Sequence, residues 1–214
     1  MRLDHVSYVA SHDQISDVVN RIGSQIGTAF VDGGIHPKFG TRNFTAPLLN
    51  GQYIEVVCPL DHPATDTTPF GKLVKKKSDA GGGWLAWVLS TNDIAEVEKN
   101  FGRKSSEGAR VKPDGTWLKW KQIGIEELDL SEEMPFFIEW TSDFHPSKDG
   151  NAISLISKIM IISENELRNT WYANNLNSKM IDISIDWHKP NLINSQSGIY
   201  AVEFEVKTQK ILIV

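Results

Sequence analysis

The chain has 214 residues, 40% of them hydrophobic, and a net charge of −5, which suits one globular domain or two small fused ones. The acidic balance argues against a nucleic-acid partner, and no apolar run approaches the ~20 residues that a membrane span needs. The single cysteine, Cys58, excludes an internal disulfide and a Cys-rich zinc site. Without a visible secretory signal, we expect a cytoplasmic protein.

The first 58 residues predict a βαβββ unit. Residues 2–9 alternate like a strand, and apolar residues from Ile15 to Ile26 recur at helical spacing until Gly27 ends the helix. A Gly-Gly turn follows, and then two strands near 43–49 and 52–58. The next residues, 59–83, hold three prolines, a basic triplet and a run of three glycines at the end, Gly81 to Gly83, which predicts a loop-rich connector.

The same order of elements restarts at residue 84 and again at 157. In the second copy, Gly102 ends the helix, and strands are expected near 84–90, 108–112, 116–123 and 135–141. In the third copy, a Ser163–Glu166 capping box begins a helix with Leu167 and Trp171 on one face, and strands are expected near 157–163, 179–187, 198–206 and 209–214. The prediction is a paired-module domain over 1–146, made of modules 1–58 and 84–146, and a third, degenerate module over 147–214.

Three ionisable residues lie within otherwise apolar strands: His5, Glu55 and Glu139. Strand alternation places each of them on a face with neutral, mostly apolar neighbours. A buried carboxylate costs several kcal/mol unless it is paired or bound to a metal. A divalent cation such as Zn, Ni, Mn, Fe or Co would gather the imidazole and both carboxylates.

Five short motifs follow one another over residues 1–146. They are Leu3-Asp4-His5-Val6, Gly33-Gly34-Ile35-His36-Pro37, Gly40-Thr41-Arg42-Asn43, Tyr53-Ile54-Glu55-Val56-Val57 and Phe137-Ile138-Glu139-Trp140. In this order they resemble the vicinal oxygen chelate superfamily of glyoxalases, bleomycin-resistance proteins and extradiol dioxygenases, in its glyoxalase-like branch. The resemblance implies an α+β fold in which paired βαβββ modules form a curved mixed sheet around a small-molecule cavity.

The resemblance also implies metal ligands at His5 and Glu55 in module one and at Glu139 in module two. The fourth ligand position falls on Trp84, which cannot bind a metal. Three open alternatives follow: a three-ligand site completed by water or substrate, a site completed by another residue such as His145, or no metal. In the third module, Ser157 stands at the histidine position and no glutamate follows, so no metal site is expected there.

Each candidate has a structural alternative. His5 can be a strand histidine with a satisfied hydrogen bond, Glu55 can pair with Arg42 or a lysine, and Glu139 can pair with His5 or Lys119. The residues expected to bind substrate at the cavity wall are His36, Arg42, Asn43, Trp84 and His145, whereas Trp87 is expected in the core.

The functional hypothesis is a metal-dependent isomerase or lyase that acts on a small oxygen-rich molecule, with Glu139 and Glu55 as catalytic groups as well as ligands. A dioxygenase is disfavoured because only one histidine is in register. The alternative is a metal-free protein that binds or sequesters a small molecule. The odd third module either packs back on the first two or pairs with its copy in a homodimer.

Overall fold

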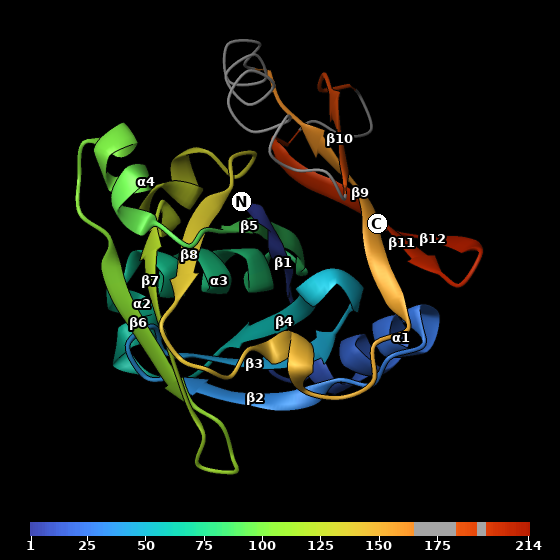
Figure 1. Ribbon diagram of the computed structural model, residues 1–214, viewed down its shortest axis with the longest axis horizontal. Helices are drawn as coiled ribbons and strands as arrows, with labels where there is room; N and C mark the ends of the chain where they lie inside the picture. Colours follow the sequence, from blue (N-terminus) through green and yellow to red (C-terminus); the bar gives the residue numbers. More distant parts are fainter. Residues whose placement is uncertain (165–182, 192–195) are drawn as a thin grey trace.

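A computed structural model of the chain describes residues 1–164, 183–191 and 196–214. In this part of the chain, eight strands close into a barrel and four more form a separate sheet (Figure 1). The barrel order is β1-β4-β3-β2-β6-β7-β8-β5, so each predicted module contributes four adjacent strands. This order confirms the predicted α+β fold of repeated βαβββ modules in a curved mixed sheet.

Module one follows the predicted order of elements: β1 (Arg2–Val9), α1 (Ile15–Ile26), β2 (Val31–His36), β3 (Thr41–Pro47), the 3-10 turn η1 (Leu49–Gly51) and β4 (Tyr53–Pro59). Gly27 adopts a left-handed conformation and ends α1 as predicted. The predicted Gly-Gly turn is wrong, because Gly33 and Gly34 lie inside β2, where the pairing with β3 shifts register. A Cβ atom on Gly33 would lie 2.2 Å from Asn43 Oδ1, so the strand needs glycine there for packing.

Module two repeats the pattern with β5 (Gly83–Ser90), α4 (Ile94–Phe101), β6 (Ser106–Val111), β7 (Trp117–Ile123), the 3-10 segment η2 (Ile125–Leu130) and β8 (Phe136–Trp140). The first strand of each module pairs in parallel with its last, β1 with β4 and β5 with β8. The barrel closes along β1 and β5, which are antiparallel over most of their length, and at a shorter seam between β2 and β6.

The connector between the modules is helical, which corrects the loop predicted from its prolines. It contains α2 (Pro63–Thr67) and α3 (Pro69–Asp79), and each helix begins with a proline. Proline suits the first helical position because its fixed φ is helical and its missing N–H would have no partner there. His62 caps α2, Thr68 caps α3, and Phe70 lies on the buried face of α3.

The C-terminal strands are β9 (Ser154–Ile162), β10 (Ser184–His188), β11 (Gly198–Val206) and β12 (Gln209–Ile213), preceded by the 3-10 turn η3 (Pro146–Lys148). Their order, β10-β9-β11-β12, puts the first strand inside the sheet and the last at its edge. Modules one and two instead pair the first strand with the last, so the third copy has diverged in topology. The predicted helix around Leu167 and Trp171 lies outside the described residues.

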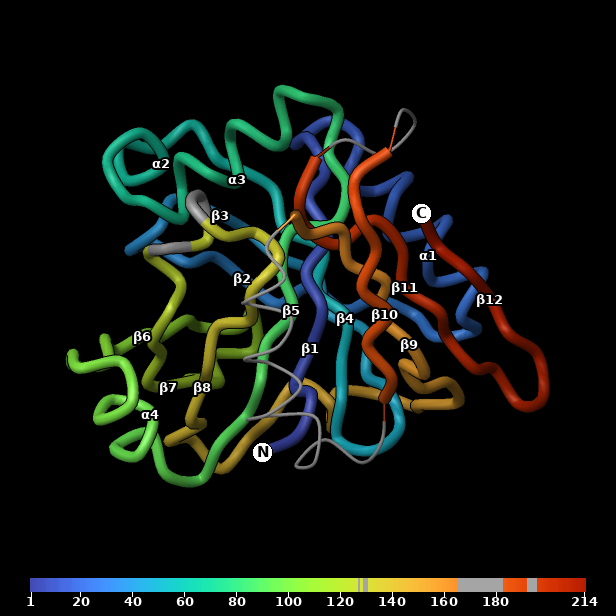
Figure 2. The backbone as a smooth tube through the Cα atoms, turned by 90° about the horizontal axis from the view of Figure 1, so that it is seen from above, coloured from blue at the N-terminus to red at the C-terminus, as the bar shows by residue number. Residues whose placement is uncertain are grey.

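The C-terminal sheet packs against the outside of the barrel, which is one of the two arrangements expected for the odd module. Figure 2 shows its strands on the α1 side of the barrel, and β11 contacts both β5 and α1. Trp84 from β5 joins the two layers: its indole N–H donates to the carbonyl of Ile213 at 3.0 Å, and its ring stacks on Phe204. Buried apolar residues of both layers form one continuous core.

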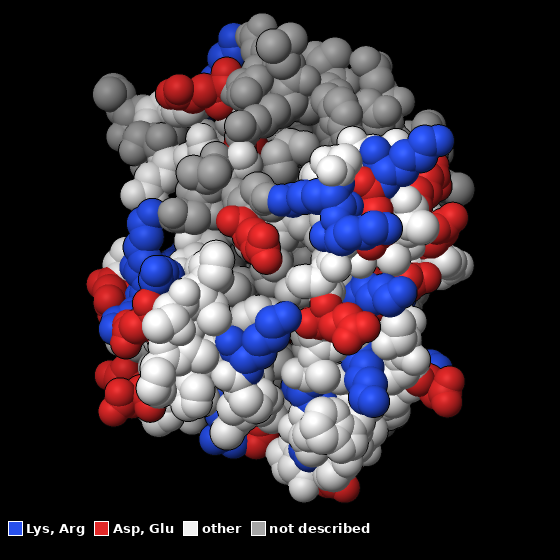
Figure 3. Space-filling view, turned by 90° about the vertical axis from the view of Figure 1, so that its left-hand side faces the viewer, with Lys and Arg blue, Asp and Glu red and all other residues white. Residues whose placement is uncertain are grey.

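Charges of both signs are mixed among the described residues on the face that Figure 3 displays. None of the described helices is long and apolar enough to cross a membrane. On the displayed face, no basic patch of the kind that binds nucleic acid is visible over the part of the chain that the structure describes.

Candidate functional site

A small cavity of about 40 Å³ lies inside the barrel. Its walls come from β1, β2, β3, β4, β6, β7, β8 and the helical connector, so both modules contribute to it. The polar residues that line it are His5, His36, Asn43, Tyr53, Glu55, Arg110 and Gln122, and the apolar walls include Phe39, Phe70, Trp120, Ile125, Phe136, Ile138 and Trp140. Since one water needs roughly 10–15 Å³, a cavity of this size suits a group of a few heavy atoms.

His5 is held in the cavity by Asp4, its neighbour in the chain. Regular alternation would put the two residues on opposite faces of β1, but the pairing with β5 shifts register between Leu3 and His5. This bulge lets the Asp4 carboxylate reach His5, with Oδ2 3.0 Å from Nδ1. The His5 ring also stacks on Tyr53, with ring centroids 4.4 Å apart. Sequence alternation alone missed Asp4 as part of the site.

Asp4 is fully buried and serves as a shared acceptor behind the cavity. Its oxygens contact His145 Nε2 at 3.1 Å, Trp140 Nε1 at 3.1 Å and Arg2 Nη2 at 3.1 Å, as well as His5. Burial opposes ionisation, but the hydrogen bonds and charges of His145 and His5 outweigh it and hold the pKa of Asp4 far below its ordinary value. The ionised carboxylate fixes the proton of His5 on Nδ1 and leaves Nε2 for the ligand side.

Glu55 faces the same cavity from β4 and is held in an ionised state. Ser7 donates to Oε2 at 2.8 Å, and the Asn43 amide donates to Oε1 at 2.5 Å. Burial raises the pKa of this carboxyl, but His5 and His36 in their protonated forms and the two hydrogen bonds together lower it. An anionic carboxylate and a histidine therefore line one cavity, an arrangement that suits proton transfer.

Arg110 supplies a buried cation that sequence reasoning missed. It comes from β6, is 3% exposed, and donates through Nη1 to the carbonyl of Gly33 and to Asn43 Oδ1. Burial lowers the pKa of this guanidinium, which stays charged at neutral pH. An arginine in a short alternating strand usually faces solvent, and only the closure of the barrel reveals that this one points inward.

His36 and Asn43 lie where they were expected, at the cavity wall. The His36 imidazole contacts the Thr41 hydroxyl at 3.2 Å and packs edge-on to Trp120. Burial, with a further effect of the positive charge of Arg110, lowers the pKa of His36 to about 4, so its ring is neutral at neutral pH. Their roles in binding substrate stay predictions.

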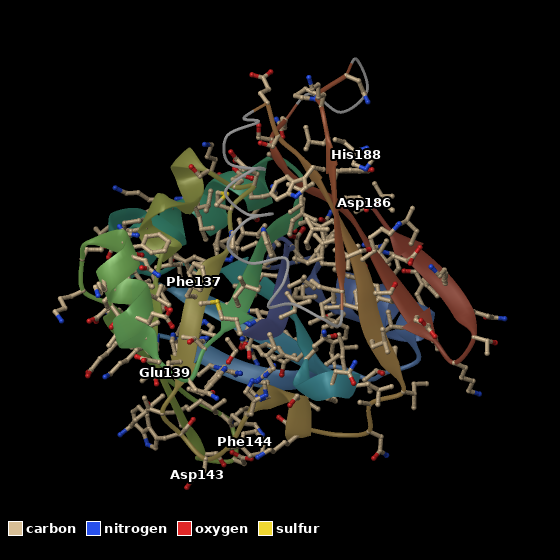
Figure 4. All side chains as sticks on the ribbon, turned by 45° about the horizontal axis from the view of Figure 1, so that its top comes forward. Phe137, Glu139, Asp143, Phe144, Asp186 and His188 are labelled. Carbon is tan, nitrogen blue, oxygen red and sulfur yellow. The ribbon has the colours of Figure 1, made fainter. Side chains whose placement is uncertain are left out.

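Glu139, by contrast, does not reach the cavity. Ile138 and Trp140 of β8 line it, so Glu139 points to the outer face, where its register partner is Lys121. Phe137 lies on the same outer face and packs against Phe101 of α4 (Figure 4). The sequence match aligned Glu139 with Glu55, but Ile138 is the residue of β8 that corresponds to Glu55. A shift of one residue along a strand moves a side chain to the opposite face of the sheet.

Three other expected wall residues also lie elsewhere. Trp84 packs under the C-terminal sheet, and Val88 is the residue of β5 opposite His5. Arg42 lies on the outer face of β3 and forms an ion pair with Asp32. His145 stands behind the site and positions Asp4 while its Nδ1 accepts from the backbone of Ser147 at 3.1 Å. Trp87 is fully buried, as expected.

The donor set does not fit the expected three-ligand metal site. Among the described residues, no three His, Cys, Asp or Glu side chains come together closely enough to hold a metal ion. Only His5 and Glu55 of the expected ligands share the cavity, and the guanidinium of Arg110 lines it as well. A second cation there would meet the repulsion of that fixed charge.

The comparison with protein families settles the assignment. A family model described as a glyoxalase-like domain matches residues 3–174. The chain therefore belongs to the glyoxalase-like domain family. This family lies within the vicinal oxygen chelate superfamily that the motifs indicated. No curated protein matches the chain.

Solved structures are similar to the chain at low sequence identity, and the first of them shares its fold. A hypothetical protein from Staphylococcus aureus is 18% identical, with a TM-score of 0.59, and the match covers 99% of this chain and 84% of that one. Methylmalonyl-CoA epimerase from Mycobacterium tuberculosis is 14% identical over 64% of this chain and 85% of its own, with a TM-score of 0.43. The first similarity extends over the barrel and the C-terminal sheet together.

Proposed function

We propose that this glyoxalase-like protein is an isomerase- or lyase-type enzyme that moves a proton on a small oxygen-rich molecule inside the barrel. One observation carries the proposal: His5, held by Asp4 from behind, and the ionised Glu55 line the same cavity. The Glu55 carboxylate can act as the general base and the His5 imidazole as the general acid. Such a pair suits removal of a proton at one position of the substrate and delivery of a proton at another.

The proposed reaction begins when the Glu55 carboxylate removes a proton from a carbon next to a carbonyl group. The electron pair of the broken C–H bond moves toward the carbonyl oxygen and forms an enolate. In an isomerase, His5 starts as the imidazolium and donates its Nε2 proton back to carbon, which leaves His5 neutral with its remaining proton on Nδ1 and Glu55 protonated; a proton then returns from Glu55 to His5 through solvent. In a lyase, the enolate pair expels a neighbouring leaving group, which departs with its bonding electrons and takes the His5 proton. Asp4 stabilises the imidazolium form of His5 in either case.

Glu55→Gln tests the proposal. In D2O, wild-type protein should incorporate deuterium next to the carbonyl of at least one member of a panel of small oxo acids, hydroxyaldehydes and thioesters, followed by proton NMR. The variant should lose about 10²- to 10⁴-fold of that rate, because it lacks the base. The rate should survive prior treatment with a chelator, since the described donors form no three-ligand metal site.

Glu139→Gln is the matched control, because Glu139 lies in the corresponding strand of module two but on its outer face. It should keep the wild-type exchange rate. Loss of exchange in Glu139→Gln with retention in Glu55→Gln would contradict the assignment of the base.

A second candidate function, metal-free binding or sequestration, is favoured by the aromatic walls. Trp120 and Trp140 both line the cavity, and their ring centroids are 5.5 Å apart. A ligand in the cavity should therefore quench tryptophan fluorescence. Saturable quenching by a compound that undergoes neither exchange nor conversion would favour sequestration over catalysis.

We also propose a reducing, cytoplasmic environment, which suits the single buried cysteine. Burial raises the pKa of the Cys58 thiol to about 11, so it stays protonated and poorly reactive. The homodimer expected from the third module stays a prediction.

A further inference from the structure

Arg110 is a buried cation that forms no direct ion pair with the described acidic residues. No carboxylate oxygen of the described residues lies within 4.0 Å of its guanidinium. Glu55 is linked to it only indirectly, because the Asn43 amide donates to Glu55 and its Oδ1 accepts from Arg110. A buried charge without a direct partner is costly, and this cost falls when a ligand of opposite charge binds.

The guanidinium also has N–H groups that donate to no described protein atom. Its two protein acceptors, the Gly33 carbonyl and Asn43 Oδ1, both bind Nη1. Nε and Nη2 have no acceptor among the described residues. Neither atom is fully inaccessible, so a water-sized ligand atom can reach them. Two N–H groups on one edge of a guanidinium match the two oxygens of a carboxylate.

The surroundings of Arg110 hold it in place. A Cβ atom on Gly33 would lie 2.4 Å from Nη1, and a Cβ atom on Gly108 would lie 2.2 Å from the indole of Trp120. Both glycines therefore leave room for large side chains that point inward. The cation is fixed before any ligand arrives, which reduces the ordering cost of binding.

We propose that Arg110 is the carboxylate-binding group of this cavity and that the ligands are short-chain carboxylic acids. The inference rests on the proposed function, which requires a carbonyl group in the substrate. A carbonyl group together with a carboxylate makes the substrate a short-chain oxo acid. The cavity volume of about 40 Å³ limits the enclosed part to a carboxylate and few further atoms.

The test compares charged probes with neutral ones of the same shape: acetate with acetamide, propionate with propionamide, and pyruvate with pyruvamide. Tryptophan fluorescence reports binding through Trp120 and Trp140. Wild-type protein should bind each acid at least about tenfold more tightly than its amide, because a charged hydrogen bond is worth at least one factor of ten. Arg110→Met should remove this preference.

Arg42→Met is the matched control, because Arg42 also lies on a barrel strand but is paired with Asp32 on the outer face. It should keep the wild-type preference. If Arg110→Met fails to fold, Arg110→Lys replaces it: lysine keeps the charge but cannot form the two-pronged contact, so carboxylates should bind more weakly than to wild type, whereas Arg42→Lys should change nothing. Equal affinity for acids and amides, an acid preference that survives in Arg110→Met, or no binding of any acid by wild-type protein would overturn the inference.

The two proposals fail separately. Glu55→Gln should still bind carboxylates through Arg110. Arg110-dependent binding without any deuterium exchange would sink only the enzymatic proposal. Exchange of neutral aldehydes at a rate that Arg110→Met leaves unchanged would sink only the carboxylate inference.

Discussion

Asp4→Asn should slow proton transfer by about 10²- to 10⁴-fold and destabilise the fold by about 3–5 kcal/mol. The substitution keeps the shape of the side chain but removes its negative charge. His5 then loses the group that fixes its proton on Nδ1, so the ring can turn the wrong nitrogen toward the ligand. His145, Trp140 and Arg2 lose a charged acceptor in a fully buried position.

The stability loss should depend on pH in a defined direction. The folded protein holds the pKa of Asp4 far below its ordinary value of 3.8. The stabilisation is therefore fully present above the ordinary pKa and is lost as the pH falls below 3.8 toward the folded value. Urea unfolding of wild type and Asp4→Asn should show a difference that is constant near neutral pH and shrinks in acid.

Asp114→Asn supplies the control for Asp4. Asp114 is an exposed carboxylate whose pKa is lowered by hydrogen bonds from Thr116, so it resembles Asp4 in the direction of its shift but not in burial. Its replacement should leave exchange unchanged and affect stability little. Equal unfolding midpoints for Asp4→Asn and Asp114→Asn would refute the role given to the buried network.

Trp84→Ala should destabilise the protein by about 3–5 kcal/mol, because it removes a large buried side chain between the barrel and the C-terminal sheet. The variant loses the stacking on Phe204, the contact with Tyr8 and the hydrogen bond to Ile213. Urea unfolding measures the loss. Hydrogen exchange should rise first in β11 and β12, which Trp84 contacts directly.

Trp117→Ala is the matched control, because Trp117 is 58% exposed on β7. It should change the free energy of unfolding by no more than about 0.5 kcal/mol. Carboxylate binding by folded Trp84→Ala should match wild type, since Trp84 does not line the cavity. If Trp84→Ala unfolds like wild type but loses ligand binding, Trp84 lines the cavity, as first expected from the sequence.

Local sequence signals were sufficient for the repeated units. Helical spacing from Ile15 to Ile26, with glycine beyond, predicted α1, and Gly102 ended the helix of module two in the same way. These signals work because a helix and its ends depend on neighbours within a few residues. The connector shows where such local signals fail. Its prolines, Pro63 and Pro69 among them, led to the prediction of a loop, although proline is equally suited to begin a helix.

The sequence by itself determined the family, the paired modules and the presence of His5 and Glu55 in apolar strands. Only the tertiary structure decided what meets in the cavity. A bulge brings Asp4 to His5, a one-residue difference in register turns Glu139 outward, and the closure of β6 onto β2 brings Arg110 inward. The physical reason is that strand side chains alternate, so a single bulge or shift reverses a face, and which face is enclosed depends on strands far apart in the chain.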